Sequence, residues 1–331
     1  MKIISKTLKF LPLLLVVLAF QACSDDDDAP IIVQERDIVD TAISTSQLTS
    51  LVAALQAADG DLVGLLKGSG PFTVLAPNNA AFTAFLADNN FASLGDVPTD
   101  VLAMVLKNHV IAGDIEAEDL QNLQANGTNY ANTSATGPGG NELSIYFNTS
   151  NGVKFNGISS VETANIDATN GTIHIVDAVI GLPTVVTFAT ADPNFSTLVT
   201  ALTTLTPDND YVATLSTPNG TSPAPFTVFA PTNTAFDELL VELEVAGFGD
   251  IPTATLIAAL NSHVVAGANV QASGLSDGLL IDTLGADLTA NITGGATLTD
   301  PNGRVSNIVA TNVQAVNGVI HAIDKVVLPQ L

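Results

Sequence analysis

Several residue types are scarce in this 331-residue chain, and each shortage excludes something. There is one cysteine, which cannot form an intramolecular disulfide. Nine lysines and arginines stand against 33 aspartates and glutamates. Because nucleic acids and anionic lipids are bound through Lys and Arg, we expect no nucleic-acid partner. With no tryptophan and three tyrosines, the chain has little aromatic surface for stacking against sugars.

Motifs for metal binding are scarce as well. No histidine belongs to a His-x-x-x-His pair, the spacing that places two zinc ligands on one face of a helix. Asp208 and Asp210 offer oxygen ligands for calcium, but the distal Glu of a recognised calcium loop is missing, and a solvated turn is the alternative. We therefore predict no cofactor, no enzymatic activity and a structural role for the four histidines, hydrogen-bonded to the backbone near the core. These are His109, His174, His263 and His321.

The N-terminus has the pattern of a secretory signal. Three lysines precede an apolar run from Phe10 to Phe20, which is shorter than the roughly 20 residues needed to span a bilayer. We predict a signal peptide over residues 1–22. Cys23 follows at once, and this arrangement resembles a bacterial lipoprotein signal, in which the cysteine is lipidated. An ordinary cleaved signal with an incidental thiol is the alternative.

Residues 23–35 form an acidic segment that begins Cys-Ser-Asp-Asp-Asp-Asp. Like charges repel, so we expect this segment to be an extended, solvated tether between the lipid and the folded part. It also looks like the export tag that sends lipoproteins of the Bacteroidetes type to the outer face of the outer membrane. We therefore expect a cell-envelope protein that is anchored to the outer membrane by lipid alone and is exposed at the surface.

The rest of the chain contains the same module twice. Residues 71–82 and 225–236 carry nearly the same phrase, Pro-Phe-Thr-Val-(Leu/Phe)-Ala-Pro-x-Asn-x-Ala-Phe. A period near 150 residues is a domain length, so we predict two domains, residues 36–182 and 184–331. The offset between the copies changes twice, which indicates seven-residue insertions within 133–150 and 206–223. We expect both to be surface loops and expect function to lie where the copies differ.

Each copy reads as helices first and strands later, which predicts an α+β fold with a largely antiparallel or mixed sheet. Apolar residues from Ile38 to Leu55 have helical spacing, and Phe72 to Ala76 has the composition of a buried strand. Asn79 and its counterpart Asn233 are placed to cap the helices that follow the repeated phrase. Both copies end in a β-rich run containing Ile-His.

Together, the proline-bounded phrase, the central histidine and the final Asn-Gly-x-Ile-His-x-(Val/Ile)-Asp-x-Val phrase resemble the fasciclin domain family, and they occur twice in the family's order. The resemblance implies two domains, each with a wedge-shaped β-sheet core and several helices packed on one side. It also implies an extracellular adhesion or matrix module without a catalytic centre. The family often has Tyr before the central histidine, whereas this chain has Asn108 and Ser262.

The sequence thus predicts a non-enzymatic cell-envelope lipoprotein that mediates adhesion or matrix contact. Its expected partner is a cell-surface or matrix protein or a polysaccharide, and an anionic glycan would require bridging Ca²⁺ or a neutral patch. The alternative is a glycan-capture lipoprotein that serves polysaccharide uptake.

Overall fold

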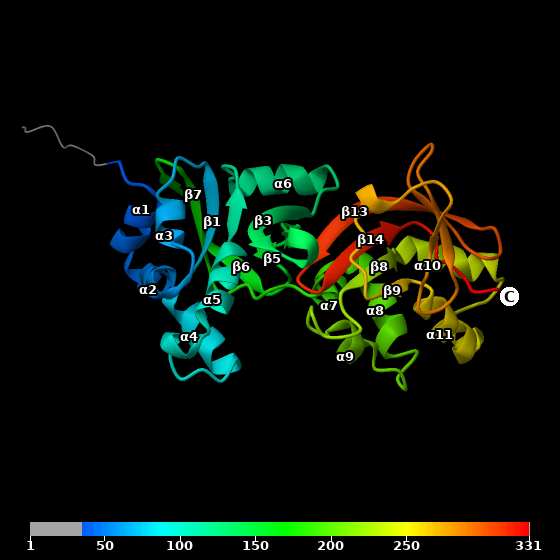
Figure 1. The fold of residues 1–331 in the computed structure, drawn as a ribbon. Coiled ribbons are helices and arrows are strands. Elements are labelled where there is room, and N and C mark those ends of the chain that lie inside the picture. Colours follow the sequence, from blue (N-terminus) through cyan, green and yellow to red (C-terminus); the bar gives the residue numbers. More distant parts are fainter. Residues whose placement is uncertain (1–34, 331) are drawn as a thin grey trace, which may run out of the picture. The chain divides into compact units, whose positions relative to one another are not determined.

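The computed structural model describes residues 35–330, and Glu35–Leu331 forms one compact unit (Figure 1). The predicted signal peptide, the predicted lipidation site Cys23 and residues 24–34 of the predicted tether lie outside the described residues.

The first repeat contains six helices and seven strands, in the order that the sequence predicts. The helices are α1 (Ile38–Ser44), α2 (Thr49–Ala57), α3 (Leu62–Leu66), α4 (Asn79–Asp88), α5 (Thr99–Lys107) and α6 (Ala117–Ala125). The strands are β1 (Phe72–Pro77), β2 (Val110–Ala112), β3 (Tyr130–Thr136), β4 (Glu142–Asn148), β5 (Lys154–Phe155), β6 (Ser159–Ala168) and β7 (Gly171–Val176).

The second repeat has the same plan with fewer regular helices. Its helices are α7 (Val185–Ala191), α8 (Ser196–Thr203), α9 (Tyr211–Leu215), α10 (Asn233–Glu242) and α11 (Thr253–Asn261). Its strands are β8 (Phe226–Pro231), β9 (Val264–Ala266), β10 (Leu279–Ile281), β11 (Leu288–Asn291), β12 (Thr297–Thr299), β13 (Val305–Ala315) and β14 (Gly318–Ile323).

The predicted α+β class with mixed sheets is confirmed. In each repeat the strand of the repeated phrase pairs parallel with the last strand, β1 with β7 and β8 with β14, while the other neighbours pair antiparallel. The first sheet closes into a barrel, whereas the second remains an open seven-stranded sheet in the order β10-β11-β12-β13-β14-β8-β9.

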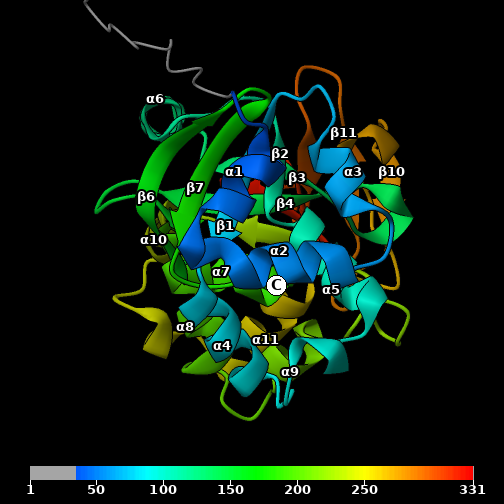
Figure 2. The same ribbon diagram turned by 90° about the vertical axis from the view of Figure 1, so that its left-hand side faces the viewer.

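Both faces of the central strand are covered in each sheet. Along β1, Val74 and Ala76 face the cluster that holds α1 to α5, while Leu75 belongs to the cluster on the other face, which α6 closes with Leu120. Figure 2, in which α1 and α2 lie nearest the viewer, shows these helices in front of β1. Burial on both faces explains why the strand reads as a continuous apolar run rather than an alternating one.

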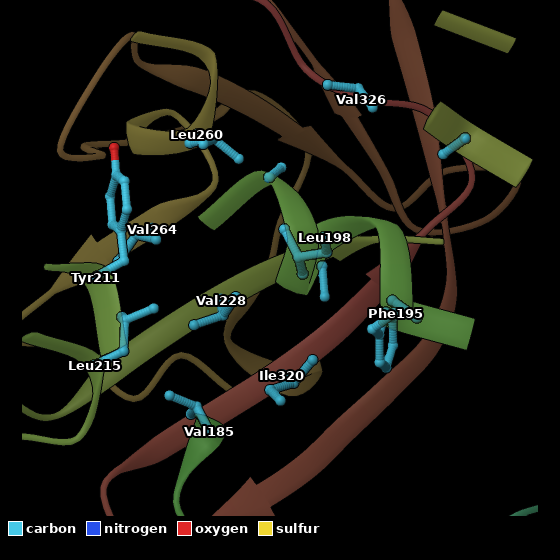
Figure 3. Close-up of a cluster of buried hydrophobic side chains, with 14 of the residues drawn as sticks. Val185, Phe195, Leu198, Tyr211, Leu215, Val228, Leu260, Val264, Ile320 and Val326 are labelled. Carbon is cyan, nitrogen blue, oxygen red and sulfur yellow. The ribbon is translucent and has the colours of Figure 1, made fainter. Parts of the chain in front are cut away.

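The same layering recurs in the second repeat. Val228 on β8 and Ile320 on β14 are register partners, and their side chains lie beneath Leu198 of α8 (Figure 3). Phe229, the next residue along β8, belongs to the cluster on the opposite face. The repeated phrase therefore supplies the central strand of a two-faced core in each copy.

The helix expected from Ile38 to Leu55 is broken. The chain leaves the α-helical conformation at Thr45, and the helical segments on its two sides meet at 102°. Ser44 and Thr45 donate their hydroxyl hydrogens to the carbonyl oxygen of Thr41, at 2.9 and 2.8 Å, and such local bonds compete with a continuing helix. Among the described residues no single helix is long and apolar enough to cross a membrane; only this bent pair meets those criteria jointly.

The expectation that both insertions are surface loops is wrong. Residues 133–150 include most of β3 and all of β4, where Ile145, Tyr146 and Phe147 are buried. Residues 206–223 include α9, whose Tyr211 and Leu215 are buried as well. Thr, Asn and Gly around a short apolar run made both segments look like loops, although the apolar run itself packs in the interior.

Strand β4 also contacts the second repeat. Tyr146 belongs to the apolar cluster of the second repeat, and Ser144 Oγ accepts the backbone N–H of Gln314 on β13 at 2.9 Å. Tyr130 on β3 donates its hydroxyl hydrogen to Oδ2 of Asp192, also at 2.9 Å. Tyr130 and Tyr146 thus both take part in contacts between the two repeats.

Candidate functional site

The repeated motifs contain four histidines, and each is tied into the fold through both ring nitrogens. At His109, Nδ1 lies 2.7 Å from the carbonyl oxygen of Val105 and must donate to it, and Nε2 accepts the backbone N–H of Ile180 at 2.9 Å. His263 repeats this with Ala259 and Val327, at 2.7 and 3.1 Å. Each ring therefore joins the helix before it to the segment after the last strand.

Burial lowers the pKa of His109 and His263 to about 4, because taking a charged ring out of water is costly; the hydrogen bond to the helix carbonyl opposes the shift without cancelling it. Both rings are consequently neutral at pH 7, with the proton on Nδ1. A ring with both nitrogens engaged in backbone bonds has no free position to take up a substrate proton.

The second histidine of each copy holds a bulged strand in place. The ladder between β6 and β7 shifts register near Asn165, which has a left-handed φ of 57°. His174 Nδ1 accepts the backbone N–H of Asn165 at 3.2 Å, and its Nε2 donates to the carbonyl oxygen of Ile115 at 2.9 Å. His321 has the corresponding partners Asn312 and Val270. Burial lowers the pKa of both rings.

Within residues 35–330, no three His, Cys, Asp or Glu side chains lie close enough together to hold a metal ion. Asp210, one of the two carboxylates considered for calcium, accepts the backbone N–H of Ala213 at 2.9 Å and caps α9.

The second repeat also contains a pattern that is typical of catalytic serines. Gly274–Gly278 has the form Gly-x-Ser-x-Gly, which in hydrolases marks a nucleophile on a turn between a strand and a helix. Here the exposed Ser276 lies in a turn that leads into strand β10, and its carbonyl oxygen accepts the N–H of Leu279. The required strand–turn–helix context is absent at this serine, so the pattern does not form such a nucleophile site.

The prediction that Asn79 and Asn233 cap the helices that follow the repeated phrase is wrong, because other residues cap those helices. The cap of α4 is Asn78, whose side chain accepts the N–H of Ala81 at 2.8 Å, and Thr232 does the same for α10. Asn79 instead accepts the N–H of Ser50 at 2.9 Å and donates to the carbonyl oxygen of Ser46. It therefore caps α2, an earlier helix that has no side-chain cap of its own.

Asn233 acts in the same way on α8, where its Oδ1 accepts the N–H of Thr197 at 2.9 Å and its Nδ2 donates to the carbonyl oxygen of Pro193. The sequence identified the right asparagines because they recur, but a local reading assigns a cap to the nearest helix. Only the packing of α4 on α2 and of α10 on α8 reveals the actual partner.

Replacing Asn79 with Ala should destabilise the first domain by about 1–2 kcal/mol, because it removes the cap of α2 and leaves the N–H of Ser50 without its acceptor. Hydrogen exchange provides the discriminating measurement. The Ser50 amide should lose protection in N79A and keep it in N78A, whereas the Ala81 amide should respond in the opposite way. Equal protection of Ser50 in both variants would contradict the cross-helix cap.

The sequence reading gave no role to the asparagine of the final Asn-Gly phrase. Asn170 accepts the N–H of Ile38 at 2.9 Å and donates to the carbonyl oxygens of Leu66 and Gly68, at 2.8 and 2.7 Å. It ties the start of α1 to the end of α3, immediately before β7. Its recurrence in the repeat was the available signal.

Asn317 makes the same three bonds in the second copy, with Val185, Leu215 and Thr217. The glycine after each asparagine is equally constrained, since a Cβ on Gly318 would collide with the backbone of Phe226. The Asn-Gly pair is therefore fixed by packing in both copies.

Comparison with known proteins agrees with this architecture. The model of the fasciclin domain matches residues 46–183 and again residues 193–329. The chain belongs to the fasciclin family. The resemblance seen in the sequence is thereby confirmed, and the repeats are two fasciclin domains.

Relatives of this fasciclin protein include short bacterial chains and long animal ones. Protein sll1483 of Synechocystis is 37% identical over 144 residues, which cover 43% of this chain and 72% of that protein. Transforming growth factor-beta-induced protein ig-h3 of the pig is 27% identical over 267 residues, which cover 80% of this chain but only 35% of the relative. A solved structure of a fasciclin domain pair, from the insect cell adhesion molecule Fasciclin I, is similar in fold. It has a TM-score of 0.51 and 20% identity, and the match covers 85% of this chain and 97% of that one.

The position before the central histidine, often Tyr in the family, has an internal role in both fasciclin domains. Asn108 donates to the carbonyl oxygen of Gly181 at 3.1 Å and accepts the hydroxyl hydrogen of Thr133. Ser262 donates to the carbonyl oxygen of Ala258 and accepts the N–H of Ala286, both at 2.8 Å. Both residues are fully buried, so neither offers a contact to a partner.

Proposed function

We propose that this protein is a non-enzymatic lipoprotein of the cell envelope whose fasciclin domains mediate adhesion to a cell-surface or matrix protein or polysaccharide. The observation that carries the proposal is the tandem fasciclin match, together with a similar domain pair in an insect cell adhesion molecule. The polar residues of the repeated motifs are satisfied inside the fold. Contact with a partner is therefore assigned to outer surfaces.

The outer face of the β10–β13 sheet offers such a surface. Strand register places Leu280, Thr289, Thr299 and Val305 in one row across four strands. Leu280 and Val305 are 64% and 48% exposed. An uncharged row of aliphatic and threonine side chains can approach a neutral polymer or protein without placing carboxylates against it.

The glycan-capture alternative receives less support. Sugar-binding faces use exposed aromatic rings. Tyr146 and Tyr211 are buried, and Tyr130 is half-buried with its hydroxyl on Asp192. Among the described residues, every strongly exposed large hydrophobic side chain is aliphatic.

A deletion strain tests the adhesion proposal directly. Cells without the protein should be retained several-fold less on a matrix-coated surface or in a biofilm, and the wild-type protein should restore retention. The double variant L280S/V305S should restore it poorly, because it removes the exposed aliphatic side chains of the β10–β13 face. The matched control I43S/V241S changes side chains of similar exposure elsewhere and should complement fully. Normal retention of the deletion strain, with surface display of the wild type verified, would refute an adhesive role.

Anchoring requires a separate experiment. We propose that Cys23 carries the lipid and that residues 24–34 hold the domains away from the outer membrane. Globomycin should block processing, palmitate labelling should vanish in Cys23→Ala, and protease added to intact cells should remove the domains. A freely soluble, unlabelled wild-type product would rule out the lipid anchor without bearing on adhesion.

A further inference from the structure

The second fasciclin domain contains an apolar pocket of about 270 Å³ between α10, α11 and the segment after β14. Its walls are mostly aliphatic, and two of its lining residues, Leu260 and Val326, are labelled in Figure 3. His263 lies at the inner end, but both its nitrogens are already bonded to backbone groups. The interior therefore presents hydrocarbon and a ring edge, with no free charged group.

The first domain provides an internal comparison, because α4 with α10 and α5 with α11 correspond at a constant offset of 154 residues. At three wall positions the first domain has larger side chains, Phe85, Phe91 and Val105, which pack on its core. The second domain has smaller ones there. These are Leu239, Val245 and Ala259.

Three substitutions run the other way. Ile251 replaces Val97 and Leu328 replaces Gly181, and both line the pocket. Phe248 replaces Leu94, but its ring packs edge-on against Phe236 at a centroid distance of 5.7 Å, and it does not line the pocket. At the rim, Leu243 replaces the polar Asn89. At Leu239, Val245 and Ala259 the pocket has thus lost side-chain atoms that the first domain has, and at Leu243 its rim is apolar where the first domain is polar.

Size and charge define what can enter. An apolar cavity of about 150 Å³ accommodates benzene, so 270 Å³ accommodates a group of roughly ten carbon atoms. The exposed Asp250 stands at the rim and the whole chain carries a net charge of −24, so an anionic ligand would meet repulsion at the entrance. A neutral ligand would meet none.

We propose that this pocket of the second fasciclin domain binds a neutral, hydrocarbon-like ligand of roughly ten carbon atoms, such as a bicyclic aromatic ring or the end of an alkyl chain. The site is independent of the adhesive surface, which lies on the β10–β13 face. The first domain has the same helices and lacks the three truncations, so we assign the site to the second domain alone.

Fluorescence titration of residues 24–331, which keep the whole compact unit, tests the site with two matched probes. N-phenyl-1-naphthylamine is neutral, and 1-anilinonaphthalene-8-sulfonate has nearly the same rings with a negative charge. The neutral probe should bind saturably with one site per chain and at least tenfold more tightly than the anionic one. Asp250→Asn should narrow that difference by improving the binding of the anionic probe.

Refilling the pocket with the first domain's own residues locates the site. Val245→Phe and Ala259→Val should each weaken binding of the neutral probe at least tenfold, whereas Val241→Phe, an exposed position on α10, should leave it unchanged. Circular dichroism verifies that each variant is folded. If the Val245→Phe variant does not fold, binding of the neutral probe to the Ala259→Val variant provides the test. Non-saturable binding to the wild type, or unaltered binding in folded variants with a filled pocket, would overturn the proposal.

Discussion

Acidification from pH 7 to pH 5 is expected to destabilise each fasciclin domain by about 2 kcal/mol through its central histidine alone. His109 and His263 have folded-state pKa values of about 4, below the ordinary value of 6.5. Between these pH values the unfolded chain binds more protons than the folded one. The stabilising contribution is therefore complete above pH 6.5 and is lost as the pH falls toward 4.

The reason for the effect is geometric. Each ring is buried and donates from Nδ1 to a helix carbonyl while Nε2 accepts a backbone N–H. The neutral ring carries its hydrogen on Nδ1. Protonation would add a hydrogen to Nε2 as well, and this hydrogen would point at a backbone N–H that cannot accept it. The protonated ring must therefore break the bond that joins the helix to the segment after the last strand, at a buried position.

Chemical denaturation at several pH values measures the effect. The variants His109→Gln and His263→Gln should be less stable than wild type at pH 7, since they lose these bonds, but the gap should narrow by about 2 kcal/mol at pH 5 because they lack the titrating ring. Working above pH 5 avoids the titration range of the carboxylates Glu118, Glu242 and Asp277, whose pKa values are lowered. A gap that stays constant with pH would contradict the assignment of the depressed pKa to these rings.

The fold class and the strands of the repeated motifs could be predicted because their chemistry is local. Phe72 to Ala76 is apolar, β-branched and bounded by prolines, and it forms β1. Strand β6 could not be found in this way. Most of its ten residues are exposed or half-buried, and two register shifts interrupt the alternation that a sequence reading depends on.

The polar residues show the same division. Recurrence identified His109 and Asn79 as important, but each has a partner far along the chain, Ile180 at 71 residues from His109 and Ser50 at 29 residues from Asn79. The pocket of the second domain escaped notice for another reason. Three of its wall positions differ between the copies by a loss of volume, as from Phe91 to Val245, and such a loss acquires meaning once burial shows that both positions face a core.

Replacing Asn317 should strongly destabilise the second domain. Asn317 is fully buried and makes three bonds, accepting from Val185 and donating to the carbonyl oxygens of Leu215 and Thr217. Removing the side chain in Asn317→Ala leaves these backbone groups without partners at the start of α7 and the end of α9. A loss of about 3–5 kcal/mol is expected from several unsatisfied groups together.

Asn317→Asp is the sharper test because it preserves shape. The carboxylate can still accept from Val185, but its second oxygen now faces two carbonyl oxygens at the distances where Nδ2 stood, 2.8 and 3.0 Å. Protonation would restore a donor toward one of them, so the stability deficit of Asn317→Asp relative to the wild type should be large at pH 7 and should shrink as the pH is lowered toward 5.

The chain contains a matched control in Asn219, which also precedes a glycine but is exposed in the loop before β8. Asn219→Asp and Asn219→Ala should change the free energy of unfolding by less than about 0.5 kcal/mol. If Asn317→Asp behaved like Asn219→Asp, the Asn-Gly phrase would be a tolerant turn. The expected difference follows because the same two residues close a turn at one site and connect two helices to a strand at the other.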